Sequence, residues 1–580
     1  MTKARRRALR LVVPGYALML ALAVTAPLLA PGYLLLRDAV STPRSYLTDA
    51  AFGLSEAAPR ALPQDFLIAA LSTVFDGGLV VKVLLIGGLF LAGWGAARLA
   101  IMVLPDAGTP GQLVAATLAV WNPYVAERLL QGHWSLLVGY GCLPWVAAAV
   151  LRLRSEPPDP KWTGWAAVVF WIALAGLTPT GLIMAAIVAL VCVPAPGGGV
   201  PRLWCAAGVL GTAVAAALPW LTASILGTAL GTSQATGVVA FAARAEPGLG
   251  TLGSLAGLGG IWNVEAVPHS RTTFFAILAT GVLLAVVALG LPAVRGRPAA
   301  LPLLILAAVS VLLPAAAATG PGLAVLRNVV DTAPGLGVVR DGQKWVALAM
   351  PGYALAGAAA VVTLRRWVRP GVTALVCAAA LIAVLPDLVW GSWGEVTSVH
   401  YPPGWAAVAK VVDADPGTVA VLPADSMRRF AWSGPAPVLD PLPRWVRADV
   451  LATGDLTISG QTVPGEGSRA REVQRMLLAG ARPDAVARAG VRWVVVETGT
   501  AGTTGTAGQT LRQLPVAYRD DDLTLYRVGG ASPVAAQGKR VAMVAAHVVW
   551  LGLLLIGAVA MAVAKIAHRR RQPYHVPFGT

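Results

Sequence analysis

Arg37-Asp38 is the charged pair that follows the first long apolar run of the chain. A carboxylate that is partly withdrawn from water at a membrane surface can have a raised pKa and can then accept a proton from a hydroxyl group. We therefore predict that Asp38 is the general base if the chain is an enzyme. The alternative is structural, because Asp38 also fits a local pair with Arg37 or an anchor at the membrane interface.

A second polar group lies between two apolar runs, within residues 121–134. Tryptophan and tyrosine are expected at a membrane interface by default, but so many hydrogen-bonding side chains exceed what an anchor needs. This density favours a polar binding site. Its candidate residues are Asn122, Tyr124, Glu127, Arg128, Gln131 and His133.

A third group stands at the start of a later apolar run and contains Arg340, Asp341 and Lys344. Cations beside a helix N-terminus suit an anion, since the guanidinium group forks onto phosphate oxygens and the free amides add partial positive charge. Asn263 and His269 precede another apolar run in a similar way. The alternative is a solvated loop with local ion pairs.

Membrane helices must position these groups. The chain has 580 residues, of which 56% are hydrophobic and 13% charged, and its mean hydropathy of +0.68 is too high for a soluble globular protein. Runs of about 20 apolar residues predict membrane spans. Twelve such runs are found, at 11–36, 79–104, 111–127, 134–153, 162–178, 180–195, 202–227, 272–294, 298–318, 342–364, 371–391 and 541–565.

Basic clusters at alternate ends of these runs predict the orientation, because Lys and Arg concentrate on the cytoplasmic side. Both termini are then cytoplasmic, and the polar loops and the region 395–538 lie outside the cell membrane. The formal charge of +17 does not indicate nucleic-acid binding, because residues 395–538 carry 14 Lys or Arg against 14 Asp or Glu. The excess charge belongs to the membrane part and its tails.

Three domains follow: a membrane domain at 1–394 with a first outer loop at 37–78, a soluble domain at 395–538, and a last span with a basic tail at 539–580. The soluble domain is predicted to be α/β, with strands at 419–423 and 491–497, a helix at 471–481 and a hairpin at 518–528. Residues 60–75 predict a short interfacial helix. The four cysteines fall in apolar runs, so neither a disulfide framework nor a zinc site is expected.

This arrangement resembles the GT-C superfamily of polyprenyl-phosphate-dependent glycosyltransferases, as found among actinobacterial cell-envelope enzymes. The resemblance implies a polytopic helical fold, a catalytic acid in the first outer loop, an interfacial helix in that loop and an outer soluble domain. Asp38, residues 60–75 and residues 395–538 occupy these positions. Arg37 stands where the family usually has a second acid, so a divalent cation such as Mg²⁺ or Mn²⁺ is left open.

The resemblance further implies that a sugar moves from a polyprenyl-phosphate donor in the bilayer to an envelope glycan acceptor. Asp38 would take the proton of the acceptor hydroxyl, while Arg340 and Lys344, with Arg128 or His133, would stabilise the departing phosphate. Two other classes remain open. A transporter is expected to have ionisable residues deep in its spans, and a non-catalytic scaffold for envelope assembly would use only the soluble domain.

Overall fold

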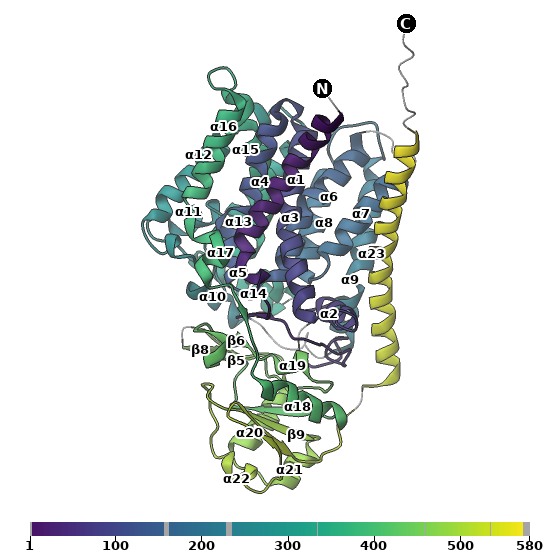
Figure 1. Ribbon diagram of the computed structural model, residues 1–580, viewed down its shortest axis with the longest axis vertical. Coiled ribbons are helices and arrows are strands. Elements are labelled where there is room, and N and C mark those ends of the chain that lie inside the picture. Colours follow the sequence, from purple (N-terminus) through teal and green to yellow (C-terminus); the bar gives the residue numbers. More distant parts are fainter. Residues whose placement is uncertain are drawn as a thin grey trace.

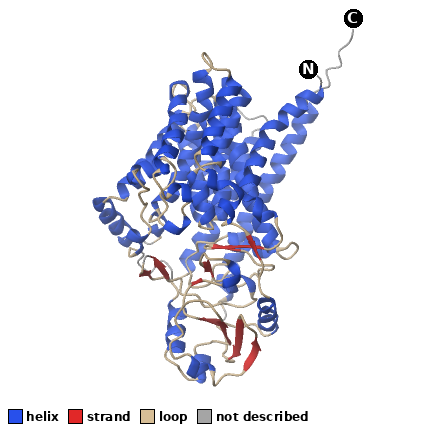
Figure 2. Ribbon diagram, turned by 60° about the vertical axis from the view of Figure 1, so that its left-hand side comes forward, coloured by secondary structure: helices blue, strands red, loops and turns tan. Residues whose placement is uncertain are grey.

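The computed structural model describes residues 3–57, 59–155, 162–227, 235–332, 335–458, 460–533 and 535–571. It consists of a helical bundle and a smaller C-terminal part, in which most of the strands are found (Figure 2). The start of α1 and the end of α23 lie at the same end of the bundle, and the C-terminal part lies at the opposite end (Figure 1). This arrangement is the one expected when both chain ends share one side of a membrane.

Each of the twelve predicted spans overlaps with a helix, but α1 ends at Thr25, and the last four residues of the predicted span 11–36 form strand β1 (Tyr33–Leu36). The helices are α1 (Lys3–Thr25), α3 (Gly77–Val103), α4 (Gly108–Val120), α6 (Trp134–Ser155), α7 (Trp162–Ala175), α8 (Pro179–Cys192), α9 (Arg202–Leu226), α12 (Phe275–Val294), α13 (Leu301–Ala317), α15 (Met350–Leu364), α16 (Pro370–Ala383) and α23 (Gln537–Arg571). In the described part of the chain, seven helices are long and apolar enough to cross a membrane, and nine if each of two bent pairs counts as one span. The chain is therefore a multi-pass membrane protein, and the number twelve stays a prediction.

The twelve predicted spans exceed these nine because three of the helices, α4, α7 and α8, are short. The 13 residues of α4 rise by about 20 Å, which is less than the roughly 30 Å of a bilayer core. The sequence predicted one helix over 111–127, but α4 ends at Val120. Asn122 caps a new helix, α5 (Pro123–Leu130), whose first residue is a proline that has no N–H to donate to the preceding turn.

Two helices form the centre of the bundle. In α6, 89% of the residues in its 18-residue apolar stretch are buried. The value is 83% for the segment Gly342–Leu364, which ends with α15. The corresponding values for α1, α9, α12 and α23 are only 33–39%, so these helices face the surroundings. The second polar group of the sequence precedes and begins α6, and the third begins the segment that leads into α15. The contact of Arg128 with Asp341 brings the two groups together.

The C-terminal part contains a four-stranded sheet in the order β10-β11-β9-β4. Strands β4 (Val419–Leu422) and β9 (Trp493–Glu497) are parallel, and the hairpin of β10 (Val516–Arg519) and β11 (Leu523–Arg527) is antiparallel. With α18 (Pro403–Ala414), α20 (Ser468–Leu478) and α21 (Pro483–Arg488), these elements confirm the predicted strands, helix and hairpin. Two small ribbons, β5–β6 (Met427–Arg428, Val438–Leu439) and β7–β8 (Leu456–Ile458, Gln461–Val463), complete this part.

A short hairpin joins the bundle to the C-terminal part. Strand β1 (Tyr33–Leu36) pairs with β2 (Ala39–Val40) on one side and with β3 (Ser398–Val399) on the other. Side chains alternate along a strand, so the hairpin serves two cores. Leu34, Leu36 and Ala39 pack into the bundle core, and Leu35 and Val40 pack into the core of the C-terminal part.

The rest of the first loop is fastened to the C-terminal part by its charged residues. Its helix α2 (Gln64–Leu71), with Pro63 at its N-cap, is shorter than the predicted 60–75. Three of these residues hold the loop to the C-terminal part: Glu56 binds Ser468 and the Arg469 amide, Arg60 pairs with Glu466, and Asp65 pairs with Arg444. Asp49 pairs with Arg540 at the start of α23.

Candidate active site

Arg37 and Asp38 form the two-residue turn of the β1–β2 hairpin. The two side chains differ in exposure, since Arg37 is buried and the Asp38 side chain is 39% exposed. Arg37 does not pair with Asp38 as the structural alternative supposed. It donates to the carbonyl oxygens of Leu130, at 2.6 Å, and Glu265.

The turn after α5 holds the Asp38 carboxylate. Gln131 Nε2 donates to Asp38 Oδ2 at 3.1 Å, and His133 Nε2 lies 2.9 Å from the same oxygen. The Asp38 amide donates to the Gln131 carbonyl at 3.2 Å. These contacts orient the carboxylate and use one of its oxygens, so that Oδ1 has no hydrogen bond from the described chain.

The tautomer of His133 follows from its second neighbour. Nη1 of Arg128 lies 3.1 Å from His133 Nδ1, and a guanidinium group can only donate, so Nδ1 accepts and Nε2 carries the proton that is donated to Asp38. Burial lowers the pKa of His133, and Arg128 lowers it further against the opposite effect of Asp38. His133 is therefore a neutral donor to Asp38.

The pKa of Asp38 differs from the sequence prediction. Burial raises this pKa, but it is outweighed by the hydrogen bond from His133 and the positive charge that His133 gains in acid, by the hydrogen bond from Gln131 and by the charge of Lys344. Together they hold the pKa below the usual value. The expected raised pKa is wrong, because the sequence did not reveal these donors. Asp38 is instead a carboxylate that stays ionised and is ready to accept a proton.

Arg128 forms the support beneath this pair. It is completely buried and donates to both oxygens of Asp341, at 2.8 and 2.9 Å, and to Gln343 Oε1. Burial raises the pKa of Asp341, but Arg128 and Lys344 lower it to about 2. Arg128 is thus occupied by the protein itself and does not face a ligand, although the sequence proposed it for phosphate binding.

The remaining members of the second polar group extend this support. Glu127 accepts hydrogen bonds from the amides of Gly260 and Ile261, both at 3.1 Å, and from Gln343 Nε2 at 2.9 Å. Asn263 donates to Gln131 Oε1 at 2.7 Å. The network therefore connects α5, the loop around 260 and the 3-10 helix η7 (Gly342–Ala349), which leads into α15.

Asn122 and Tyr124 are buried and support α5. Asn122 caps the helix by accepting from the Val125 amide, and Tyr124 stacks on Tyr140 with ring centroids 5.2 Å apart. His269 lies elsewhere: it is exposed in η5 (His269–Arg271), and no contact of the described chain joins it to the Asp38 network. Of the twelve predicted residues, Asn122 and Tyr124 thus only support the site, and His269 lies outside it.

Three cations lie near one another, and the charge of one of them, Lys344, acts on Asp38. The Lys344 side chain is 20% exposed, with Nζ 3.9 Å from Asp341 Oδ2. Arg340 stacks on the Phe241 ring at 4.4 Å, and burial, with a smaller contribution from Arg60, lowers its pKa to about 10. The third cation is Arg60 of the first loop. The sequence did not indicate its role, because Arg60 is far in the sequence from Arg340 and Lys344.

Gly132 allows the two turns to approach each other. Its φ of +83° is in the left-handed region, and a methyl group at this position would overlap with the Leu36 oxygen and the Ala39 nitrogen of the hairpin. We expect Gly132→Ala to displace Asp38 from His133 and to reduce stability and transfer activity together. Gly281→Ala is the matched control, because its Cβ would meet nothing within 4 Å. Equal unfolding temperatures and activities of both variants in detergent would contradict this prediction.

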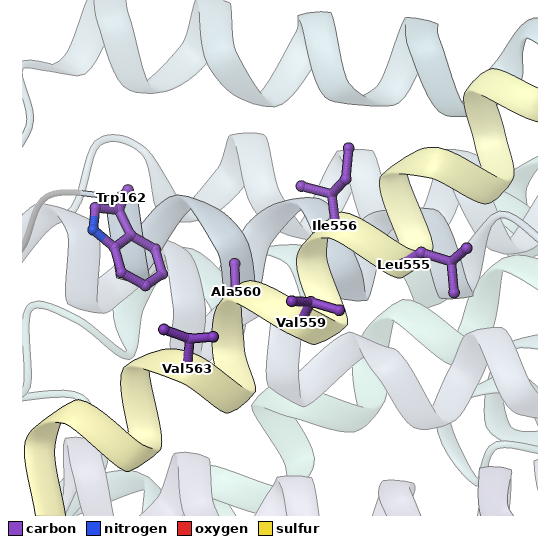
Figure 3. Close-up of a pocket in the computed structure, with 6 residues that line it drawn as sticks. All are labelled: Trp162, Leu555, Ile556, Val559, Ala560 and Val563. Atoms are coloured by element: carbon purple, nitrogen blue, oxygen red, sulfur yellow. The ribbon is translucent and has the colours of Figure 1, made fainter.

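Two cavities lie away from Asp38. One, of about 440 Å³, is an apolar groove formed by Trp162 and by residues of α23 such as Leu555 and Val559 (Figure 3). The other, of about 340 Å³, lies between the first loop and the C-terminal part, with Asp49 and Asp449 in its wall. Neither is lined by the Asp38 network, so the candidate site is the partly open surface around the hairpin turn.

The carboxylates of the network do not fit a divalent cation. Both oxygens of Asp341 bind Arg128 and both oxygens of Glu127 bind amides, which leaves only Oδ1 of Asp38. In the described ranges, no group of three His, Cys, Asp or Glu residues is placed to hold a metal ion. A cation at this site would also lie beside Lys344, which repels it.

Two solved structures of the arabinofuranosyltransferase AftD from mycobacteria are similar in fold. Their TM-scores are 0.55 and 0.50, at 18% and 16% identity. The similarity covers 91% and 88% of this chain but only 42% and 41% of AftD, so the chain spans less than half of AftD. No family model and no curated protein matches the sequence. At this identity the likeness shows the fold alone: the chain folds like a part of AftD.

Proposed function

We propose that the protein is a glycosyltransferase that moves a sugar from a polyprenyl-phosphate donor to a cell-envelope glycan or glycolipid. The observation that carries this proposal is the partly exposed Asp38 carboxylate, oriented by His133 and Gln131 beside the cation Lys344. A base next to a positive charge suits a reaction in which a hydroxyl group loses a proton and a phosphate leaves. The GT-C-like fold supports the same reaction class.

In the proposed reaction Asp38 Oδ1 takes the proton from the acceptor hydroxyl as its oxygen bonds to the anomeric carbon. The bond between this carbon and the phosphate oxygen breaks, and its electron pair leaves with the lipid phosphate. His133 remains neutral and keeps Asp38 in place. The low pKa of Asp38 keeps the base ionised before the reaction, and a lipid phosphate is a good enough leaving group for one base to suffice.

Lys344, Arg340 and Arg60 would bind the lipid phosphate and stabilise its charge as it leaves. Lys344 is partly exposed, and Arg340 is held over the Phe241 ring. Arg60 pairs with Glu466, but its side chain is 51% exposed and can reach a ligand as well. We propose that these cations perform the task that a divalent metal performs elsewhere, since the carboxylates do not form a metal site. The reaction is then independent of Mg²⁺ and Mn²⁺.

The double variant Arg340→Ala/Lys344→Ala is expected to bind the donor more weakly. Each charge-assisted contact contributes roughly 1.5–3 kcal/mol, so the loss of two raises the KM for the donor by at least about 100-fold. Titration with a labelled polyprenyl-phosphate sugar measures this change. Arg202→Ala, at the inner end of α9 in the predicted topology, is the matched control. Unchanged donor affinity in the double variant would remove the anion site from the proposal.

The site is proposed to work on the outer face of the cytoplasmic membrane. The hairpin and the C-terminal part lie at one end of the bundle, opposite the basic N-terminal segment (Figure 1). By the rule that basic residues stay in the cytoplasm, the hairpin end is extracytoplasmic. A cysteine introduced at Arg482, whose side chain is 85% exposed, should react with a membrane-impermeant thiol reagent in intact cells. Reaction only after cell lysis would reverse the orientation.

The function is tested by transfer itself. Purified protein in lipid nanodiscs receives a polyprenyl-phosphate donor with a radiolabelled sugar, arabinofuranose or mannose, and an envelope glycan extract as acceptor. We expect label in the glycan fraction, in equal amounts with Mg²⁺ and with a chelator. Donor binding without transfer would contradict the proposed reaction, and loss of transfer with the chelator would contradict its independence of metal.

A further inference from the structure

Three separate parts of the chain contact Arg37 of the hairpin turn. Its guanidinium group donates to the carbonyl oxygens of Leu130, at the end of α5, and Glu265, in the loop before α12. Its own amide donates to the Pro437 carbonyl at 2.9 Å, and its carbonyl accepts from the Leu439 amide at 2.8 Å. With 4% exposure, Arg37 faces the protein and not a ligand.

The backbone of Arg37 is held in an uncommon conformation. Its φ of +47° lies in the left-handed region, which non-glycine residues seldom adopt. Such a conformation persists where the surroundings determine it, and it is often found at functional sites. Here the surroundings include the C-terminal part, whose core contains Leu35 and Val40 from the two strands of the hairpin.

We propose that Arg37 is a positioning residue for Asp38 and that, through it, the C-terminal part belongs to the catalytic unit. Arg37 ties the hairpin turn to the bundle by its side chain and to the C-terminal part by its backbone. The place of the neighbouring Asp38 carboxylate is then set by both parts together. The proposal rests on the function proposed for Asp38, and it matters because a displacement of about 1 Å can lower a rate about 100-fold.

Two variants of Arg37 test this role. Arg37→Ala removes both side-chain contacts, and Arg37→Lys keeps the charge but not the two-pronged geometry. The control is Arg482→Ala, because the Arg482 side chain is 85% exposed and forms a salt bridge with its near neighbour Asp484. The first measurement is the rate at which a water-soluble carbodiimide and glycine ethyl ester label the Asp38 carboxylate, followed by mass spectrometry; it needs no substrate.

The second measurement is transfer. In Arg37→Ala we expect Asp38 to be labelled several-fold faster and kcat to fall by about 100-fold. The KM for the donor should stay unchanged, because the anion site is intact, and Arg37→Lys should recover part of kcat. Arg482→Ala should match the wild type in both measurements. A general loss of folded protein would also lower the apparent kcat at an unchanged KM, so kcat is expressed per amount of folded protein. The recovery in Arg37→Lys and the labelling rate of folded protein then identify positioning.

Wild-type labelling and wild-type kcat in Arg37→Ala would overturn the proposal, and so would a fall in kcat without any change in labelling. If the wild type transfers no sugar, the proposed function fails, while the labelling rates still decide whether Arg37 positions Asp38. If Arg37→Ala does not fold, Val40→Ala replaces it. That variant removes a contact with the C-terminal core at the other strand of the hairpin and should also accelerate labelling; an unchanged rate would overturn the proposal.

Discussion

Asp38→Asn is expected to lower kcat for sugar transfer by about 10²–10⁴-fold, the usual contribution of a general base. Asparagine has nearly the same shape and still accepts the hydrogen bonds from His133 and Gln131, so the hairpin turn should keep its structure. The amide cannot take up the proton of the acceptor hydroxyl. Donor binding should therefore remain close to that of the wild type while the chemical step is lost.

The dependence on pH gives this prediction a second test. The pKa of Asp38 is lowered, so its carboxylate should be ionised at every pH above the usual aspartate value of about 4. Protonation of Asp38 should therefore not affect kcat/KM in the neutral pH range. It should lower kcat/KM only in more acidic solution. A fall with a midpoint between about pH 5 and 7 would instead indicate a raised pKa and contradict the hydrogen-bonded geometry.

Asp65→Asn is the matched control for Asp38→Asn. Asp65 lies in the same loop, and its replacement removes a negative charge in the same way. Unlike Asp38, however, Asp65 pairs with Arg444 of the C-terminal part. Its transfer rate should remain near that of the wild type. If Asp38→Asn retains full activity, Asp38 is not the base.

Arg128→Met is expected to cause the largest loss of stability, about 3–5 kcal/mol in the free energy of unfolding. Arg128 is completely buried, and its loss leaves the Asp341 carboxylate in the protein interior without its guanidinium partner. Unfolding of detergent-solubilised protein, followed by tryptophan fluorescence, measures the change. Transfer should fall as well, because His133 loses the donor that sets its tautomer.

Two further variants separate charge from packing at this position. Arg128→Met/Asp341→Asn removes both charges, and asparagine can still cap the following helix, so much of the lost stability should return. Arg297→Met breaks the Arg297–Asp106 pair, whose side chains are 40% and 49% exposed, and should cost at most about 1 kcal/mol. Equal losses in Arg128→Met and Arg297→Met would show that the buried pair has no special role.

Stability should also depend on pH through Asp341. Its pKa in the folded protein is about 2, below the usual value of an aspartate. A group with a lowered pKa adds stability that is complete above the unfolded-state value of about 4 and is lost as the pH falls toward 2. The loss should be absent in Arg128→Met/Asp341→Asn, which has no such carboxylate.

Much of the architecture could be predicted from local patterns. Apolar runs located a helix in each of the twelve proposed spans, and runs of β-branched residues located β4 and β9. The number of crossings could not be settled in this way, since α4, α7 and α8 are short and two helix pairs bend by 93° and 77°. Composition records how apolar a segment is, but packing decides how it is oriented.

The residues of the site could be predicted from local patterns, but their contacts could not. Asp38, His133 and Lys344 stand out as polar residues at the ends of apolar runs, and that pattern is local. The direction of the Asp38 pKa shift was wrong, because it depends on donors that are far away in the sequence: Gln131 and His133 follow Asp38 by 93 and 95 positions. The pairing of Arg128 with Asp341 spans 213 positions.

The sequence by itself determined that the chain is a helical membrane protein with an α/β region near its C-terminus and an acid at the end of its first apolar run. These properties follow from hydrophobicity and residue spacing, which act over a few turns or strands. Tertiary contacts, by contrast, bury Arg128, let Arg37 join the bundle to the C-terminal part, and bring Gln131 and His133 to Asp38. Each of these depends on contacts between segments that only folding brings together, and such contacts leave no periodic signal in the chain.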